Sequence, residues 1–132
     1  DMVKPGPYVA MYPPEDPNYR PTAVARTMFV DAVDLSMATT IHDYLSKSDA
    51  TMRVAQLRVL GGAMARVQAD ATAFAHRTKR MLVNVAAFYQ GDADREVRRE
   101  WVGEFARALQ PRDDGAYVGF LTDDGQDRIR SA

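Results

Sequence analysis

MLVNVAAFY, residues 81–89, is the stretch of sequence that decides the fold. It is almost continuous in apolar residues and is interrupted once, by Asn84, which is typical of a largely buried β-strand. Gly91 and Asp92 follow it and are expected to end the strand. The fold therefore depends on which elements the flanking segments supply to cover this strand.

Five further elements are predicted from hydrophobic periodicity and from helix and turn signals. They are a strand over 24–30, a helix over 34–48, a strand over 52–60, a helix from Asp92 or Asp94 to Pro111, and a strand over 115–120. The segment 63–80 is less regular, with a short strand at 65–67 and a turn of helix near 69–72. The order βαββαβ predicts an α+β, ferredoxin-like fold, in which two helices pack on one face of a four-stranded antiparallel sheet.

The two predicted helices each carry an apolar stripe at helical spacing. The first begins after Asp31 or Asp34, either of which can cap it. Its stripe is Leu35, Ala38, Ile41 and Leu45, and that of the second helix is Val97, Trp101, Phe105 and Ala108, with Val102 and Leu109 beside it. These stripes are expected to cover one face of the sheet, with Trp101 buried.

The other face of the sheet is predicted to be an open wall with polar side chains. Side chains alternate along a strand, so one set faces the helices and the other faces away. The set expected to face the helices is Ala55, Leu57, Val59, Val83, Val85 and Ala87; the set expected on the open face is Gln56, Arg58 and Asn84, flanked by exposed Leu82 and Phe88. This mixture favours a binding surface.

Composition excludes several classes of function. The 132 residues carry 17 Lys+Arg against 18 Asp+Glu, so no basic field exists to attract nucleic acid or an anionic membrane. Without cysteine there is no thiolate metal site or disulfide, and His42 and His76 are the only histidines, so no metal site is predicted. No apolar run approaches the roughly 20 residues of a membrane helix. A soluble, cytoplasmic protein is expected.

The chain is expected to have three parts, the first of which is set apart by its prolines. Six of the seven prolines fall in the first 21 residues, and proline removes a backbone donor and fixes φ. Residues 1–22 are therefore expected to form an extended arm or linker whose apolar residues lie along a surface. Residues 23–120 form the ferredoxin-like unit, and residues 121–132 begin a truncated C-terminal segment.

The motifs of common catalytic sites are absent, including phosphate-binding glycine loops and metalloprotease motifs. His42 lies beside the core stripe of its helix and is expected at the surface. His76 lies in a loop before the strongest strand, where a structural turn and a catalytic base remain the two alternatives.

Three motifs in order give the chain a resemblance to a known family. They are the pair Gly61-Gly62 in LRVLGGAMARV (57–67), the tetrad Phe74-Ala75-His76-Arg77, and Tyr117-Val118-Gly119-Phe120 behind the second helix. Over roughly residues 20–132 the chain resembles the C-terminal half of the FAD-linked oxidoreductases related to berberine bridge enzyme.

The resemblance implies a two-domain flavoenzyme. In that family an N-terminal domain, absent from this chain, binds FAD, and an antiparallel sheet lies over the flavin and forms the substrate pocket. Gln56, Arg58, Asn84, Tyr117 and Gly119 would belong to that pocket wall. The isolated chain is then expected to bind no FAD and to associate with itself through its open sheet face or its arm.

Two positions depart from the plant members of this family. The Asn and the second Tyr of their last strand correspond to Gly119 and Phe120, neither of which can accept a proton. Their proton-abstraction chemistry is therefore not carried over, and the catalytic residues stay unassigned. The leading hypothesis is the substrate domain of an oxidoreductase that transfers hydride from an alcohol, amine or sugar-like substrate to FAD. The alternative is a stand-alone ferredoxin-like module that binds a small ligand or dimerises without catalysis.

Overall fold

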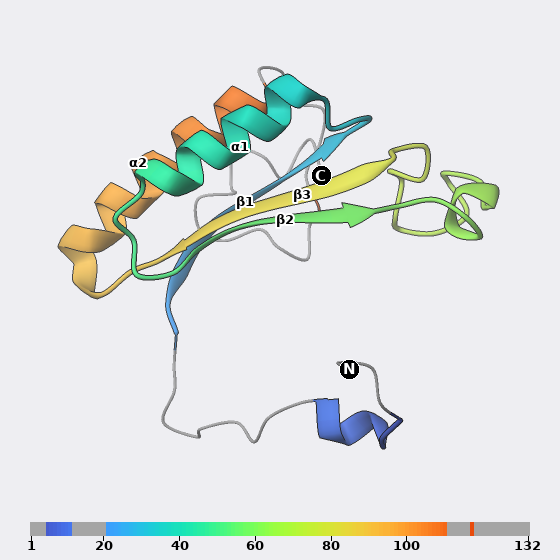
Figure 1. The fold of residues 1–132 in the computed structure, drawn as a ribbon. Coiled ribbons are helices and arrows are strands. Elements are labelled where there is room, and N and C mark those ends of the chain that lie inside the picture. Colours follow the sequence, from blue (N-terminus) through green and yellow to red (C-terminus); the bar gives the residue numbers. More distant parts are fainter. Residues whose placement is uncertain (1–4, 12–20, 111–116, 118–132) are drawn as a thin grey trace.

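A computed structural model of the chain describes residues 5–11, 21–110 and 117 (Figure 1). Its elements in order are the 3-10 helix η1 (Tyr8–Met11), strand β1 (Ala23–Val30), helix α1 (Leu35–Lys47), strand β2 (Arg53–Val59), the 3-10 helix η2 (Met64–Arg66), strand β3 (Met81–Phe88) and helix α2 (Gly91–Leu109). The strands and helices predicted over 24–109 are confirmed to within about two residues. The strand predicted at 65–67 is wrong, because η2 occupies this position.

The three strands form one antiparallel sheet in the order β1-β3-β2. β1 and β2 both run antiparallel to β3 and therefore parallel to each other, joined by α1, which is the split βαβ arrangement of ferredoxin-like folds. The α+β fold class is confirmed with three strands. The predicted fourth strand, 115–120, lies outside the described residues apart from Tyr117.

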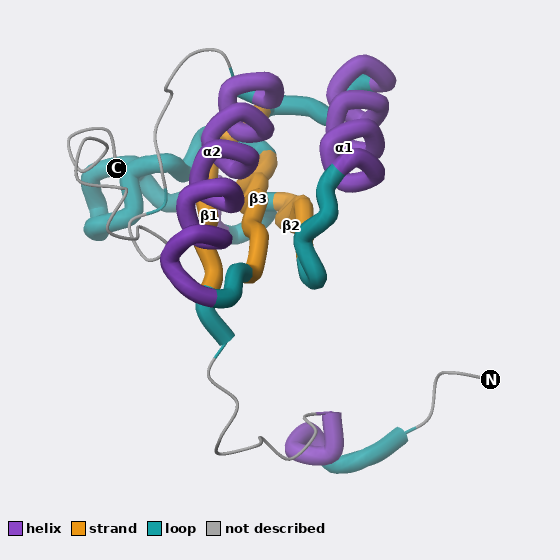
Figure 2. Tube along the Cα trace, turned by 90° about the vertical axis from the view of Figure 1, so that its left-hand side faces the viewer, coloured by secondary structure: helices purple, strands orange, loops and turns teal. Residues whose placement is uncertain are grey.

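Both helices lie on the same face of the sheet, which we call the helix face (Figure 2). α2 packs on β1 and β3, whereas α1 packs on α2 and β2. The core between helices and sheet consists of Val24, Met28, Val30, Ala50, Val83, Val85, Ala87, Val102, Phe105, Ala106 and Leu109. The opposite side of the sheet, the back face, carries the alternate residues of each strand.

Helix α1 begins as predicted but packs less deeply than predicted. The Asp34 carboxylate caps it by accepting a hydrogen bond of 2.8 Å from the Met37 amide. However, no residue of α1 is fully buried. Leu35 is 83% exposed and Ala38 is also exposed, whereas Ile41 and Leu45 are half-buried against the core. The expectation for Leu35 and Ala38 is wrong because α1 lies toward the edge of the sheet, over β2 alone.

Helix α2 is rotated relative to the predicted stripe. Its buried residues are Arg98, Val102, Phe105, Ala106 and Leu109, while Val97 is 54% exposed and Ala108 is exposed. Trp101 is half-buried and contacts Tyr44 of α1, with ring centroids 6.5 Å apart. The predicted caps are also wrong: Gln90 is the N-cap residue, and Asp94 instead accepts from the Gln90 amide at 2.9 Å.

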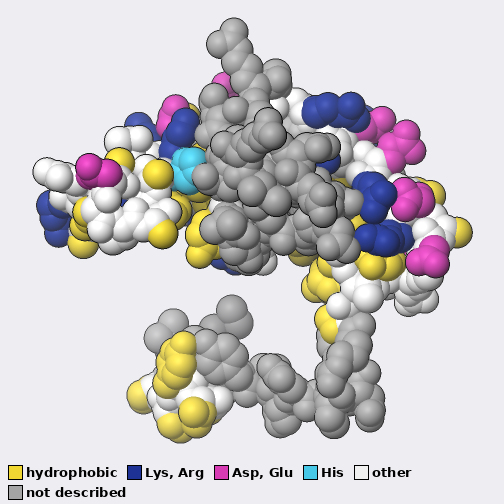
Figure 3. All heavy atoms as spheres, turned by 180° about the vertical axis from the view of Figure 1, so that it is seen from behind, with side chains coloured by type: hydrophobic (Ala, Val, Ile, Leu, Met, Phe, Trp, Pro, Cys, Tyr) yellow, Lys and Arg dark blue, Asp and Glu magenta, His cyan; other side chains and the backbone are white. Residues whose placement is uncertain are grey.

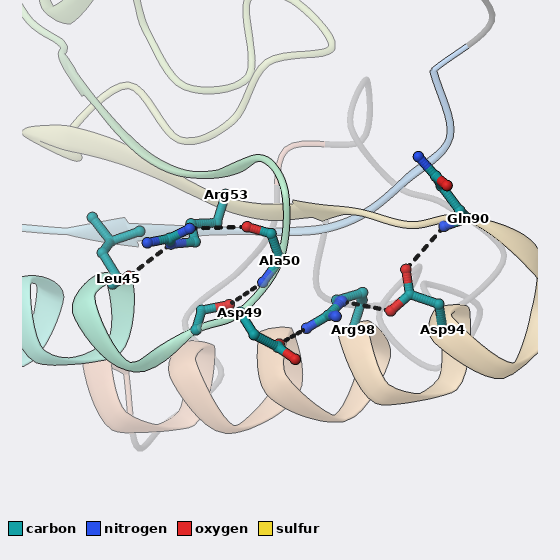
Figure 4. Close-up of polar contacts among 8 residues, drawn as sticks. Leu45, Asp49, Ala50, Arg53, Gln90, Asp94 and Arg98 are labelled. Atoms are coloured by element: carbon teal, nitrogen blue, oxygen red, sulfur yellow. Dashed lines mark hydrogen bonds and ion pairs between the residues drawn. The ribbon is translucent and has the colours of Figure 1, made fainter.

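Arg98 explains this rotation (Figure 4). Its guanidinium bonds Asp49, in the loop between α1 and β2, and pairs with Asp94 one turn back on α2 at 2.8 Å. Arg98 lowers the pKa of the Asp49 carboxyl, mainly through their hydrogen bond. A buried arginine needs such partners, so α2 turns Arg98 inward, and Val97 is directed to solvent.

No helix in the described part of the chain is long and apolar enough to span a membrane. Seen from behind (Figure 3), the basic and acidic side chains of the described residues lie interspersed rather than in a patch of one sign.

Candidate functional site

A row of polar side chains crosses the back face from β2 to β3. Gln56 lies opposite Asn84 in the strand register, and Arg58 lies opposite Leu82. The Gln56 amide oxygen accepts hydrogen bonds from Asn84 Nδ2 at 3.3 Å and from Arg58 Nη2 at 3.1 Å. The prediction that Gln56, Arg58 and Asn84 share the face turned away from the helices is therefore confirmed. We call these three residues the polar row.

One hydrogen-bond acceptor of the polar row has no partner among the described residues. Asn84 Oδ1 is shielded from solvent and has no hydrogen-bond partner within the described residues. A buried acceptor without a partner costs free energy. A ligand with an N–H or O–H group placed against Asn84 would satisfy this atom.

The loop over residues 60–80 brings the family-motif residues to the same face. It starts with a sharp turn, in which Gly61 and Gly62 have φ of 130° and 59°, values that side-chain-bearing residues rarely adopt. Arg77 then holds the loop together, because its guanidinium donates to the Met64 carbonyl oxygen at 3.3 Å and to the Thr72 hydroxyl. Arg77 is buried, so its role is to hold the loop in shape and not to form part of the exposed back face.

His76 and Phe74 reach the sheet at Phe29 of β1. The His76 ring stacks on Phe29 with centroids 4.4 Å apart, and Phe74 meets Phe29 edge-on at 6.3 Å. Tyr117 meets Phe74 at 6.1 Å, and the Tyr117 amide donates to the Thr27 hydroxyl at 3.2 Å. These contacts define an aromatic cluster on the back face.

The aromatic cluster and the polar row are continuous. Thr27 lies opposite Asn84, and Phe29 lies opposite Leu82, so each strand contributes neighbouring residues to one surface. The structure thus brings six predicted site residues to the back face: Gln56, Arg58, Asn84, Phe74, His76 and Tyr117. Gly61, Gly62 and Arg77 shape the adjacent loop, and Gly119 lies outside the described residues.

The environment of His76 keeps its imidazole neutral. Burial, and to a smaller extent the charge of Lys79, lowers the pKa of His76 from its usual 6.5. Its Nε2 atom is shielded from solvent and has no hydrogen-bond partner in the described part of the chain. His76 therefore offers the back face an uncharged ring. No described acidic side chain bonds it, so nothing orients it as a general base.

The expected exposure of four strand residues is wrong. Leu82 is buried, at 6% exposure, and Phe88 is half-buried, although both were expected to be open. Leu82 lies in register between Phe29 and Arg58, whose side chains flank it on the same face. Conversely, Leu57 and Val59 do point to the helix face but are 44% and 80% exposed, because the helices do not cover this end of β2.

Sequence reasoning missed Thr27 and Phe29 as members of the back face. Both are buried, at 1% and 2% exposure. The signal was present, since alternation along 24–30 places Thr27 and Phe29 together, opposite Val24 and Met28. What alternation alone does not give is the strand register that joins Thr27 to Asn84.

A comparison of the chain with models of known protein families finds no match. A comparison with curated proteins finds no match either.

Proposed function

We propose that this chain is the substrate-facing part of an FAD-linked oxidoreductase related to berberine bridge enzyme, with the back face as the wall of its substrate pocket. The observation that carries the proposal is the polar row beside the aromatic cluster on the face that the helices leave uncovered. Such a wall combines a few placed polar groups with flat apolar surface, which is usual for small-molecule sites.

The residues present fit a flavin and an oxidisable small substrate. Flavin and substrate both present planar or apolar surface for Phe74, His76 and Tyr117, and N–H or O–H donors for Asn84 Oδ1. FAD, when bound, supplies the redox chemistry by accepting hydride from a C–H bond of an alcohol, amine or sugar-like substrate. Arg58 supplies positive charge to the wall, which favours an anionic substrate group or the negative charge of a reduced cofactor.

The dinucleotide itself would be held by a separate N-terminal domain of the same protein. In this proposal the 132 residues orient the substrate and exclude water, and they do not retain FAD when isolated. The alternative function, a stand-alone module that binds a small ligand or dimerises, would use the same back face without a cofactor.

The absorption spectrum of the purified protein tests the proposal. The full-length product of the gene that contains this sequence should retain flavin through gel filtration and show its visible absorption bands, whereas the isolated 132-residue chain should be colourless. A full-length product without flavin would contradict the proposal and favour the stand-alone module. Stoichiometric flavin on the isolated chain would show that the assignment of FAD binding to another domain is wrong.

A further inference from the structure

The outer edge of β2 has the features of a slot for one more β-strand. The Phe88 amide donates to the Met52 carbonyl oxygen at 2.9 Å, and the Leu60 amide donates to the Arg80 carbonyl oxygen at 2.8 Å. In an antiparallel pair the bonded residues alternate. The even-numbered residues of β2 therefore bond β3, while the N–H and C=O groups of Ala55, Leu57 and Val59 point outward. Within the described residues, no backbone hydrogen bond reaches these groups.

Helix α1 overhangs this edge. α2 lies over β1 and β3, and Figure 2 shows α1 displaced beyond α2 to the outer side of β2. No residue of α1 is fully buried, and Leu57 and Val59, on the helix face of β2, are exposed. A cavity of about 470 Å³ lies beside the C-terminal half of α1 and the start of β2, lined by His42, Leu45, Ser46, Thr51, Met52 and Arg53. Among the residues that the structure describes, none covers the exposed apolar side chains of this helix and edge.

β2 carries two arginines, Arg53 and Arg58, and charge on an edge strand opposes strand addition. The Arg53 guanidinium is held by the Leu45 and Ala50 carbonyl oxygens at 2.7 and 2.9 Å, and Arg58 bonds Gln56 on the back face. The positions between and beyond them on the helix face, Ala55, Leu57 and Val59, carry neither charge nor proline, and the register of β2 with β3 is continuous from Arg53 to Val59. The missing cover is therefore an extended segment with apolar side chains at alternate positions.

We propose that this slot takes the arm segment 8–12 of a second copy of the chain, by reciprocal exchange; this inference does not rest on the proposed function. The arm sequence YVAMY, residues 8–12, is bounded by Pro7 and Pro13 and matches the five positions from Ala55 to Val59 in length. Tyr and Val favour strands. In the structure Tyr8 and Val9 are 70% and 75% exposed in the short helix η1, and an isolated 3-10 turn is only marginally stable.

The sequence between arm and sheet favours exchange over folding back. Pro13, Pro14, Pro17 and Pro21 fall in this stretch of sequence, and proline-rich sequences favour semi-rigid, extended spacers. In an antiparallel register with Val9 opposite Leu57, the Val9 side chain lies on the helix face of the sheet. Each copy gives one arm and accepts one, which closes a two-fold dimer.

Cross-linking between two differently mutated chains tests the exchange. The chain has no native cysteine, so Val9→Cys and Leu57→Cys chains are mixed and oxidised. Opposed residues of a bonded antiparallel pair have Cα atoms about 5.5 Å apart, within disulfide range. We expect a disulfide-linked dimer of the two chains. The control replaces Leu57→Cys by Leu35→Cys, a more exposed position on α1, and should cross-link much less; equal yields would overturn the proposal.

Amide hydrogen exchange with light scattering decides between the possible occupants. In the wild-type dimer, the amides of Ala55, Leu57 and Val59 should exchange about tenfold or more slowly than in a Val9→Asp/Met11→Asp variant, which should be monomeric. A strictly monomeric wild type, or a dimer in which these amides exchange as in the variant, contradicts the proposal. Protection that survives in the arm variant would place a different segment in the slot, and would overturn it equally.

Discussion

At the scale of single residues, the folded environment of His76 changes its titration. It is stacked on Phe29, and burial lowers its pKa. In the unfolded chain the imidazole binds a proton near its usual pKa of 6.5, whereas in the folded chain it binds one only at lower pH. The folded state therefore loses stability as pH falls below about 6.5, and above that pH His76 contributes no pH dependence.

Replacing His76→Phe should remove this part of the pH dependence. Phenylalanine can keep the stack on Phe29 but cannot be protonated. Urea unfolding of wild type between about pH 5 and pH 7.5 should show a free energy of unfolding that rises with pH, with a smaller slope in the variant. His42→Phe is the matched control, because the His42 side chain is 79% exposed, and it should keep the wild-type slope. Identical slopes for wild type and His76→Phe would contradict this account of His76.

Strand alternation predicted the polar row, because Gln56, Arg58 and Asn84 lie on strands whose apolar residues fix the opposite face. It did not predict the partners of Arg98. A charged residue in a helix is normally assigned to the solvent side, and burial of Arg98 is favourable because it pairs with Asp94 on its own helix and with Asp49 in a distant loop. Which residues contact one another across the chain therefore had to come from the structure.

At the scale of elements, hydrophobic periodicity predicted some features of α2 correctly and others incorrectly. The apolar repeat predicted the length of the helix and the burial of Val102, Phe105 and Leu109. It did not predict the rotation of α2 about its axis. The apolar residues Val97 and Trp101 suggest that their side of the helix faces the sheet, whereas the ion pairs of Arg98 direct the neighbouring side inward. In the loop, Gly61-Gly62 predicted the break after β2, whereas η2 and the contacts of Arg77 with Met64 and Thr72, which lie within the same loop, follow no periodic pattern and were not predicted.

Because α2 is rotated, substitutions at two residues of its predicted apolar stripe, Phe105 and Val97, should lower the free energy of unfolding by different amounts. Phe105 is 0% exposed, so Phe105→Ala should lower the free energy of unfolding by about 3–5 kcal/mol through the cavity it leaves. Val97→Ala should change it by no more than about 0.5 kcal/mol, since Val97 is 54% exposed. Urea denaturation of both variants measures the difference. Similar losses would mean that Val97 faces the sheet after all.

At the scale of the whole molecule, the two faces and the outer edge of the sheet differ because both helices pack on one face only. The helix face holds the core, the back face holds the polar row and the aromatic cluster, and β2 is an edge strand of the sheet that the described residues form. The sequence predicted the two faces because β-alternation and helical stripes agree. It did not predict the open edge, since the number of strands and the overhang of α1 are set by how complete segments pack.

The most direct test of the central claim, that the back face is the substrate wall, is the anaerobic rate of flavin reduction by substrate in the full-length protein. Arg58→Ala should slow reduction about tenfold or more, because it removes positive charge from the wall, and it should barely change the melting temperature, because Arg58 is exposed. Arg107→Ala is the control, since Arg107 lies exposed on α2 and donates to the Gly103 carbonyl oxygen of its own helix at 3.2 Å. We expect the control to keep the wild-type rate. An Arg58→Ala protein that also reduces its flavin at the wild-type rate would contradict the claim.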